Sequence, residues 1–192
     1  MSFNQHDFSQ PVYFETDRLV IRTPRLEDAQ AINASIRRSL ADLKPWMVWA
    51  QEPPSLKESS TNIERAIVKY EAGKDCRLHL FLRESQTFIG SSGLHFRDRS
   101  VPSFEIGYWI DSQYRGKGYV TEAVKGITQF GLDVFGAQRI AIHADNLNVA
   151  SWRVAERAGY TLEGILHNEC RDTRGRLRDT RIYAVTATIE RN

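Results

Sequence analysis

The chain has little cysteine and almost no net charge. Its 192 residues include two cysteines, Cys76 and Cys170, and neither has a partner at the spacing of metal ligands. We interpret both as reduced thiols and expect no metal site. The 26 lysines and arginines nearly balance the 24 aspartates and glutamates, which leaves a formal charge of +2. Such an even balance argues against bulk binding of nucleic acid, and we expect no direct contact with it.

Long hydrophobic runs are also missing. No apolar stretch reaches the length of about 18 residues that a membrane span needs, and the polar N-terminus lacks the apolar core of a signal peptide. We therefore expect a soluble, cytoplasmic protein without a membrane partner. Because 41% of the residues are hydrophobic, the chain can bury one substantial core. We predict a loose leader over residues 1–11 and a single domain over residues 12–192, as a monomer or a homodimer.

Hydrophobic periodicity predicts an alternation of short strands and amphipathic helices. The strands between residues 76 and 110 have short connections, so we expect an antiparallel meander. The two strands that flank the helix at 119–134 are expected to be parallel neighbours. We predict an α+β domain with one mixed, mostly antiparallel sheet and flanking helices. The predicted strands are 12–23, 76–83, 88–96, 104–110, 139–144, one from 160 and 180–188, and the predicted helices are 27–40, about 59–72, 119–134 and 148–159.

The segment from Gln113 to Gly118 stands between a predicted strand and a predicted helix. The first N–H groups of a helix have no partners within the helix, and the helix dipole adds partial positive charge there. Gly116 and Gly118 let the backbone approach a phosphate, and Arg115 and Lys117 add positive charge. A plain turn is the simpler interpretation of two glycines. The spacing fits neither a nucleotide P-loop nor the three-glycine dinucleotide fingerprint.

Three motifs in this order resemble the Gcn5-related N-acetyltransferase (GNAT) family. The segment Gln113-x-x-Gly-x-Gly after a strand looks like the acyl-coenzyme A signature of that family. The segment Asn148-x-x-Ser, followed by Gly159 and an aromatic residue, resembles the family's last helix. Trp46-Met-Val-Trp and Glu15-Thr-Asp-Arg-Leu are similar to the RimJ/RimL branch, which acetylates the N-termini of ribosomal proteins. The resemblance covers nearly the whole chain and implies the acyl-CoA N-acyltransferase fold, with a splayed parallel strand pair.

The resemblance implies acetyl-CoA as the co-substrate and assigns residues to it. In this family the pantetheine arm lies where the central parallel strands separate, and it pairs with strand backbone, here at Trp109, Ile110 and Asp111. Asn148 and Ser151 are expected to contact the same arm. The pyrophosphate is expected to meet N–H groups of the glycine loop, with two basic side chains as a screen. The loop residues assigned to the cofactor are Gln113, Arg115, Gly116, Lys117, Gly118, Tyr119 and Val120.

Two residues are expected to carry the acid–base chemistry that the resemblance implies. Glu105 lies on the strand face opposite the apolar row, and Gly107 leaves space beside it, which suits a base acting directly or through water. An ordinary solvated glutamate is the other interpretation. Ser151 is assigned as proton donor to the leaving thiolate, although a serine in the first helical turn is unremarkable. Much of the wider family has a tyrosine for this role, at the position that Ala155 holds here.

The expected acceptor is the α-amino group of a protein N-terminus, such as that of a ribosomal protein. On the order of a tenth of such amines is neutral at pH 7, because their pKa is about 7.7–8.0, whereas far fewer lysine amines are neutral. Trp46 and Trp49 are assigned to the acceptor site as an apolar wall, together with Glu105. Two alternatives remain open: acetylation of a small amine (a polyamine, an aminoglycoside or an amino acid), or a CoA-binding module without catalysis.

Two further groups of residues carry no assigned chemistry. The segment from Arg171 to Arg181 holds five arginines, but acidic residues dilute it, and we predict a solvated charged hairpin. Four histidines on or beside predicted strands show no metal-ligand spacing, and we interpret each as a structural or surface residue. These histidines are His79, His95, His143 and His167.

Overall fold

The structure, a computed structural model, describes residues 6–98 and 100–187. An eight-stranded sheet forms its centre, in the order β1-β2-β3-β4-β5-β6-β8-β7. Among the described strands only β5 and β6 pair parallel, and all other neighbours are antiparallel. The predicted mixed sheet with one central parallel pair is confirmed. The strands are β1 (Tyr13–Glu15), β2 (Leu19–Arg22), β3 (Cys76–Leu82), β4 (Phe88–Asp98), β5 (Ser103–Ile110), β6 (Arg139–Asp145), β7 (Thr161–Arg171) and β8 (Leu177–Thr186).

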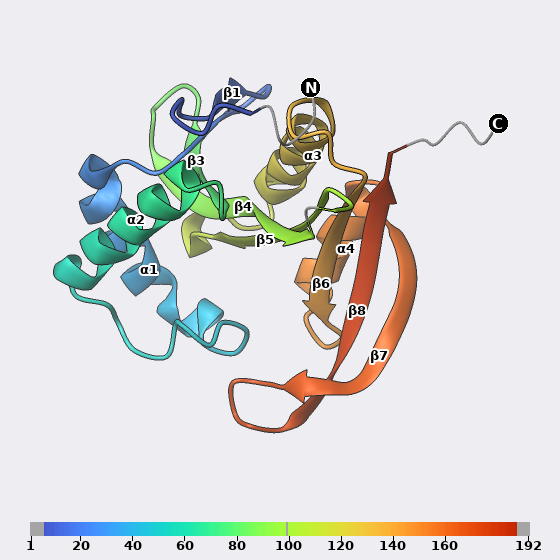
Figure 1. Cartoon of the computed structure of the whole chain (residues 1–192). Coiled ribbons are helices and arrows are strands. Elements are labelled where there is room, and N and C mark those ends of the chain that lie inside the picture. Colours follow the sequence, from blue (N-terminus) through green and yellow to red (C-terminus); the bar gives the residue numbers. More distant parts are fainter. Residues whose placement is uncertain (1–5, 99, 188–192) are drawn as a thin grey trace.

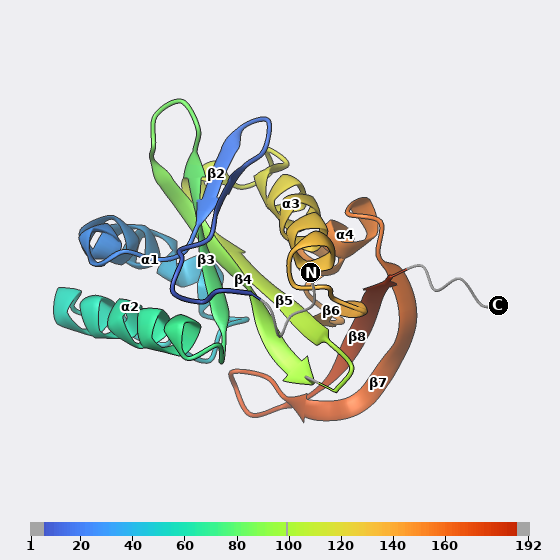
Figure 2. The ribbon, with the colours of Figure 1, turned by 45° about the horizontal axis from the view of Figure 1, so that its top comes forward.

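Helices cover both faces of the sheet. Figures 1 and 2 show α1 and α2 on one side of the sheet and α3 and α4 on the other. Each is amphipathic, as in α3, where Val124, Ile127 and Gly131 form a buried stripe. No helix in the described part of the chain is long and apolar enough to cross a membrane. The helices are α1 (Ala29–Leu43), α2 (Leu56–Glu71), α3 (Tyr119–Asp133) and α4 (Val149–Arg157), with short 3-10 turns η2 (Leu26–Asp28) and η3 (Ser112–Tyr114).

The sheet separates two buried clusters of apolar side chains. The larger lies under α3 and α4 and includes Phe104 and Ile106 of β5 together with Ile127. The smaller lies under α1 and α2 and includes Ile36 and Phe88. Full burial of a side chain of this size contributes about 1.5–3 kcal/mol to folding. Strand β5 is therefore held firmly in the middle of the molecule, with apolar packing on both sides.

The predicted strand over residues 12–23 is wrong, because the structure has a hairpin there. The Thr16 amide donates to the Leu19 carbonyl at 2.9 Å, and the Leu19 amide donates to Thr16 Oγ1 at 3.2 Å. Glu122 of α3 accepts hydrogen bonds from the Thr16 hydroxyl at 2.6 Å and the Arg18 amide at 2.8 Å. Gly126 makes this approach possible, since a Cβ there would lie 2.8 Å from Thr16 Cγ2. The turn thus depends on partners in α3.

Residues 6–11 are packed on the domain, in contrast to the loose leader expected there. The ring of Phe8 lies 5.4 Å from that of Tyr70 and 5.9 Å from that of Phe135. The Tyr70 hydroxyl donates to the Gln10 carbonyl at 2.7 Å. One aromatic side chain in a polar segment is therefore enough to anchor it. Residues 1–5 lie outside the described residues.

Helix α2 begins earlier than the sequence suggests. Ser55, and not Ser59 or Ser60, is its N-cap: Ser55 Oγ accepts the Glu58 amide at 3.2 Å, and the Glu58 carboxylate accepts the Ser55 amide at 2.7 Å. This reciprocal pair is a capping box, which satisfies two backbone donors at once. The α1–α2 connection (residues 44–55) is consequently short, and it carries the two tryptophans assigned to the acceptor.

Candidate functional site

The parallel strands β5 and β6 separate part of the way along their length. Their register ends at Glu105 opposite Ala141, and no further pair follows among the described residues. Strand β5 continues to Ile110 against β4, and β6 continues to Asp145 against β8. Each strand therefore keeps one unpaired edge over residues 106–110 and 142–145, a region that we call the β5–β6 divergence. The separation that the family resemblance implied is confirmed.

The free edge of β5 is formed by its even-numbered residues. In an antiparallel ladder, alternate residues direct both backbone groups to the same neighbour. The Asp111 amide donates to the Ile89 carbonyl of β4 at 2.8 Å, so Trp109 and Asp111 face β4. Tyr108 and Ile110 face the β5–β6 divergence. Of the three backbone contacts expected for a ligand, only Ile110 presents its groups there, because the Asp111 amide is already bonded.

Asp111 instead anchors the start of the glycine loop. Its fully buried carboxylate forms an ion pair with Arg38 of α1 and accepts the Gln113 amide at 3.0 Å. Burial pushes the pKa of Asp111 upward, but hydrogen bonds from Arg38 and Gln113 outweigh it, and the net pKa is lowered. The carboxylate is therefore ionised at neutral pH and holds η3 against α1.

The loop that follows has a backbone shaped by glycine. Gly116 and Gly118 have backbone φ values of 74° and 81°, which residues other than glycine rarely adopt. A Cβ at Gly116 would have no described atom within 4 Å, so the loop is open at that point. Gly118 is the N-cap of α3 and offers no capping side chain to the N–H groups of Tyr119 and Val120. These groups and the helix dipole suit an anion.

The basic side chains near the loop are arranged differently from the expectation. Arg115 forms an ion pair of 2.6 Å with Asp42 of α1, and Lys117 Nζ lies 5.3 Å from the centre of the Tyr114 ring. Arg18 donates to the Lys117 carbonyl at 3.0 Å and so reaches the loop from the β1–β2 turn. Sequence reasoning missed Arg18 as a loop residue, because 99 positions separate it from Lys117.

The first turn of α4 approaches β5 from the side of the larger cluster. Asn148 caps the helix by accepting the Ser151 amide at 3.1 Å. Ser151 Oγ lies 3.3 Å from the Tyr108 hydroxyl, which donates to the Ser151 carbonyl at 2.8 Å. Tyr108 was missed, although its alternation with Ile110 is a signal that could have identified it. Ala155 is fully buried, so the position that holds a tyrosine in much of the family only packs here.

Glu105 lies on the opposite face of β5, which it shares with Trp109 and the smaller apolar cluster. Arg97 Nε donates to Glu105 Oε2 at 3.0 Å, and His143 Nδ1 lies 3.4 Å from the same oxygen. The side chain is 17% exposed. Gly107 and Trp109 share this face, as the alternation predicted. Glu105 and Ser151 are thus brought to the same strand from opposite sides of the sheet.

An aromatic wall lies beyond Glu105 on this face. The rings of Trp49 and Trp109 are 6.0 Å apart, and that of Trp109 lies 5.8 Å from Phe88. Trp49 is 53% exposed, so much of its indole surface is available. Trp46 lies in the same α1–α2 connection and is half-buried. The structure thus places Trp49, the cofactor-assigned Trp109 and Glu105 on one face of the sheet.

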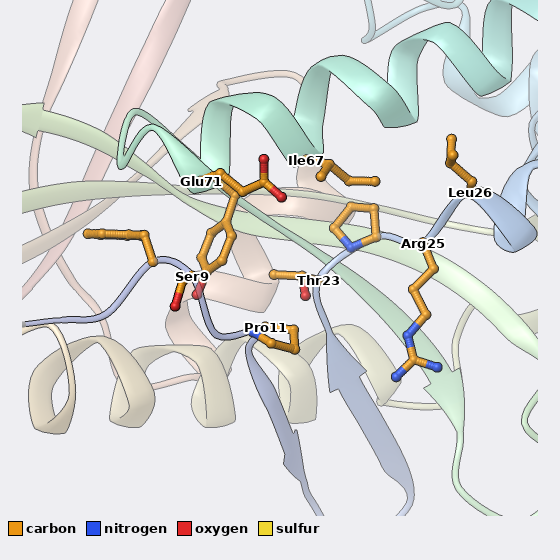
Figure 3. A pocket seen from close by; sticks show the side chains of 10 residues that line it. Ser9, Pro11, Thr23, Arg25, Leu26, Ile67 and Glu71 are labelled. Carbon is orange, nitrogen blue, oxygen red and sulfur yellow. The ribbon is translucent and has the colours of Figure 1, made fainter.

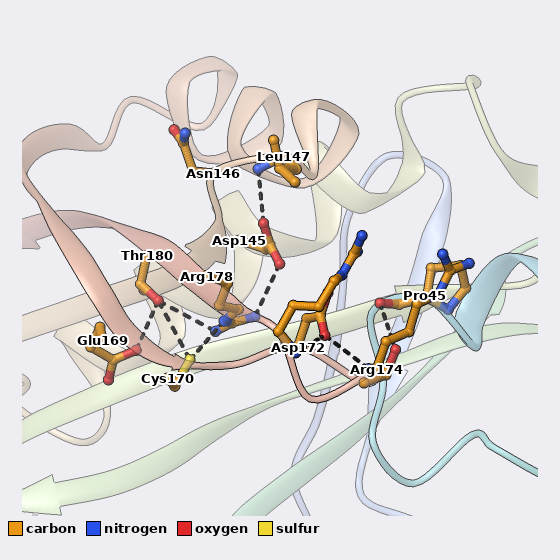
Figure 4. A network of polar contacts seen from close by, with 12 residues as sticks. Pro45, Asp145, Asn146, Leu147, Glu169, Cys170, Asp172, Arg174, Arg178 and Thr180 are labelled. Atoms are coloured by element: carbon orange, nitrogen blue, oxygen red, sulfur yellow. Dashed lines mark hydrogen bonds and ion pairs between the residues drawn. The ribbon is translucent and has the colours of Figure 1, made fainter.

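The β7–β8 hairpin reaches the same connection from the other side. Thr173 Oγ1 at its tip donates to the Pro45 carbonyl at 3.2 Å (Figure 4). Below the tip, Arg178 lies 3.6 Å from Asp145 and donates to Cys170 Sγ at 2.7 Å. The predicted charged hairpin is present, and its tip is attached to the tryptophan-bearing connection. Both segments therefore border the face that holds Trp49 and Trp109.

A separate hollow of about 330 Å³ lies away from this arrangement (Figure 3). Its lining comes from the N-terminal segment, the β2–η2 connection and α2, and includes none of the assigned site residues. Nor do the described residues contain a group of three His, Cys, Asp or Glu side chains that could hold a metal ion. The lining residues are Phe8, Ser9, Pro11, Thr23, Pro24, Arg25, Leu26, Ile67, Tyr70 and Glu71.

Comparison with known proteins gives a family match over most of the chain. The model of the acetyltransferase (GNAT) domain matches residues 18–161. A curated relative, the uncharacterized N-acetyltransferase YoaA of Bacillus subtilis (strain 168), is 26% identical over 176 residues. That alignment covers 92% of this chain and 97% of the relative.

Two solved structures are similar over nearly the whole chain. The microcin C7 self immunity acetyltransferase MccE, in complex with acetyl-CoA and AMP, is 26% identical with a TM-score of 0.81, covering 90% of this chain and 94% of that one. RimL, the ribosomal L7/L12 alpha-N-protein acetyltransferase, in complex with coenzyme A, is 20% identical with a TM-score of 0.83. It covers 91% of this chain and 98% of RimL, and at this identity the likeness shows the fold.

Proposed function

We propose, from the premise that the chain belongs to the GNAT acetyltransferase family and is an acetyl-CoA-dependent N-acetyltransferase, that its acceptor is the N-terminal α-amino group of a protein. The observation that carries this proposal is the pairing of Trp49 with Trp109 on the face that holds Glu105. Aromatic rings suit the first side chain of a peptide, and a carboxylate on the same face suits its amine. A polycationic small acceptor would favour a pocket lined by several carboxylates.

Acetyl-CoA, the co-substrate, is assigned to the β5–β6 divergence and the glycine loop. The pyrophosphate is assigned to the open N–H groups at Gly116–Val120, with Lys117 and Arg18 as nearby positive charges. The pantetheine arm is assigned to the free edge at Tyr108 and Ile110, with Asn148 beside it. Because the loop follows the end of β5, this direction places the thioester deeper in the divergence, toward the point where the strands rejoin.

The reaction is direct attack of the amine on the thioester in a ternary complex. Glu105 is assigned as the base, directly or through water, and Ser151 Oγ as the proton donor to the leaving thiolate. The N–C bond forms and the C–S bond breaks between them. Their positions on opposite faces of β5 suit this order, since the amine enters on one side of the acetyl carbon and the thiolate leaves on the other. Holding both reactants in place removes much of the entropic cost of their encounter.

A ribosomal protein is the first candidate for the protein whose N-terminal amine is the acceptor. The RimL neighbour is named for acetylating ribosomal L7/L12, and it has the same fold. A ribosomal acceptor would place the enzyme in the cytoplasm, with a protein as its partner. The aromatic wall is compatible with an exposed N-terminal peptide of any such protein.

A small-molecule amine is the second candidate, and one comparison favours it. The MccE neighbour, at higher identity, is named for self immunity to microcin C7 and contains AMP. A small acceptor needs an enclosed site, and the Thr173–Pro45 contact brings two segments together over the acceptor face. The two candidates therefore differ in whether Trp49 meets a peptide side chain or part of a compact molecule.

A panel of acceptors separates the candidates. CoA release is measured with short peptides bearing free α-amines, the same peptides with blocked α-amines, and polyamines. The proposal expects turnover of the free peptides alone, and a KM for peptide raised about tenfold in Trp49→Ala, since truncation of an interface tryptophan commonly costs more than 1 kcal/mol. Turnover of polyamines with no turnover of any peptide would overturn it.

A further inference from the structure

The imidazole of His95 and the carboxylate of Asp75 form a hydrogen-bonded pair beside the assigned site. His95 Nδ1 lies 2.7 Å from Asp75 Oδ1. The two side chains are 39% and 17% exposed. An ionised carboxylate only accepts hydrogen bonds, so a neutral imidazole places its proton on Nδ1 and keeps the lone pair on Nε2. The pair thus presents a basic nitrogen of fixed orientation.

That nitrogen lies over Gly107 of β5. A Cβ at Gly107 would lie 3.6 Å from His95 Nε2 and 3.8 Å from Cδ2, and no other described atom comes within 4 Å of it. His95 is also the register partner of Glu105. Gly107 follows Glu105, the last paired residue of β5, by two positions on the same face. His95 Nε2 therefore lies on the same face as Glu105 and above the first residues of β5 beyond its paired part, where the thioester is assigned.

Glu105 by itself can receive only one of the protons that the acceptor loses. Its Oε2 is engaged by Arg97 at 3.0 Å and lies 3.4 Å from His143, and no contact of Oε1 is found among the described residues. An α-ammonium group loses one proton before it can attack and a second as the N–C bond forms. A second proton acceptor next to Glu105 on the same face would take the proton that Glu105 does not.

We propose that His95 is a second catalytic base, with Asp75 as its positioning residue; this rests on the proposed function. Glu105 takes the first proton from the ammonium, and His95 Nε2 takes the second as the nitrogen bonds to the acetyl carbon. The C–S bond breaks, and the thiolate receives a proton from Ser151. Of the two protons removed, one restores Ser151 through solvent and one is released. Ammonium and thioester thus give amide, thiol and one proton.

Chemical rescue tests this assignment. His95→Ala is expected to lower kcat by about 100-fold, while calorimetric affinity for acetyl-CoA stays unchanged. Added imidazole should restore part of the rate, and pyrazole, which has the same size but is a much weaker base, should not. The matched control is His167→Ala, because His167 also pairs with an aspartate, Asp179, at 3.0 Å but lies on exposed β7. It should keep the wild-type rate.

Two further variants change the pair without removing the ring. Asp75→Asn replaces the ionised acceptor of Nδ1–H by a neutral amide, whose NH2 group can donate to Nδ1 and move the imidazole proton to Nε2, and it is expected to lower kcat by about tenfold or more. Gly107→Ala adds a methyl group at an ordinary contact distance from His95, so the protein should fold. That methyl group fills the space between Nε2 and the acceptor, and kcat should fall while acetyl-CoA still binds.

The pH dependence separates His95 from Glu105. Above about pH 9 an α-amine is already neutral, so the loss in Glu105→Gln should shrink, whereas the loss in His95→Ala should persist. A His95→Ala rate within about threefold of wild type, or a large loss that imidazole does not rescue, would overturn the proposal. The series is run with whichever amine the acceptor panel identifies. The acceptor panel therefore tests the peptide acceptor, and the His95 variants test the base, so that either proposal can fail without the other.

Discussion

The Tyr108 hydroxyl donates a hydrogen bond to the backbone carbonyl of Ser151 at 2.8 Å. This bond joins the free edge of β5 to the first turn of α4. Burial raises the pKa of Tyr108 to about 12, so the phenol stays protonated and remains a donor at any pH at which the enzyme works. Ser151, the residue assigned as the acid, is therefore held by a residue outside the assigned acid–base pair.

Substitution of Ser151 tests the acid directly. Ser151→Ala should lower kcat by about 100-fold or more, because a proton donor acts mainly in the transition state. Its affinity for acetyl-CoA should fall far less, by the loss of one contact to the pantetheine arm. Assays of CoA release give kcat, and calorimetry gives the affinity for acetyl-CoA. Ser60→Ala is the control, since Ser60 is half-buried on α2 and its hydroxyl donates to the Leu56 carbonyl at 3.1 Å, away from the assigned site. A Ser151→Ala rate within about threefold of wild type would contradict the role.

Substitution of Glu105 tests the base. Glu105→Gln keeps the shape of the side chain and should lower kcat by about 100-fold near pH 7. Glu163→Gln is matched to it, because Glu163 is also paired with an arginine, Arg139, but lies on β7 away from the divergence. That control should be indistinguishable from wild type. Equal effects of the two substitutions would show that Glu105 acts only through its ion pair.

The glycine loop can be tested with a control of equal backbone strain. Gly116 and Gly175 have φ values of 74° and 78°, and a Cβ at either would meet no described atom within 4 Å. Alanine at each should cost about 1–2 kcal/mol of stability, measured by urea unfolding. Only Gly116→Ala should also weaken coenzyme A binding, by about tenfold or 1.4 kcal/mol. Equal coenzyme A affinity in the two variants would remove the loop from the phosphate site.

A buried histidine predicts how stability changes with pH. Burial lowers the pKa of His79, although Asp28, 3.4 Å away, acts in the opposite direction. A lowered folded-state pKa means that the unfolded chain binds the proton more strongly. This contribution to stability is complete above the unfolded value of about 6.5 and is lost as the pH falls below it.

The measurement is urea unfolding of wild type and His79→Gln at about pH 7.5 and pH 5.5, either side of the ordinary histidine pKa. Wild type should lose more free energy of unfolding between the two values than His79→Gln does. Equal losses would show that His79 does not set this part of the pH dependence. Arg22 pairs with Asp28 at 2.6 Å, so the carboxylate keeps a charged partner when His79 is replaced.

The sequence predicts most of the framework because its elements are strongly periodic. The apolar row of β5, the buried stripe of α3 and the glycines at 116 and 118 are local signals, and each is found where it was expected. The β1–β2 hairpin was missed because its turn contains neither glycine nor proline and is stabilised by Glu122, far along the chain. The anchoring of the N-terminal segment by Phe8 was missed in the same way, because its partner Tyr70 also lies far along the chain.

The candidate site is less accessible to sequence reasoning, because strand register decides it. The hydrogen bond from the Asp111 amide to the Ile89 carbonyl shows which residues of β5 direct their backbone groups to β4 and which to the divergence. No local sequence pattern predicts this choice. His95 was interpreted as a structural or surface residue, and its place beside Glu105 follows only from the β4–β5 register. Arg115 has the expected charge, but its partner Asp42 lies on a distant helix.

The position of the acetyl group on a peptide product shows whether an α-amine is the acceptor. A peptide with a free α-amine and an internal lysine is incubated with acetyl-CoA and enzyme, and mass-spectrometric fragmentation locates the acetyl group. The account predicts one acetyl group, on the α-nitrogen, formed by wild type and strongly reduced in Glu105→Gln. Acetyl on the lysine side chain, or no acetylated peptide from an enzyme that turns over a small amine, would contradict it.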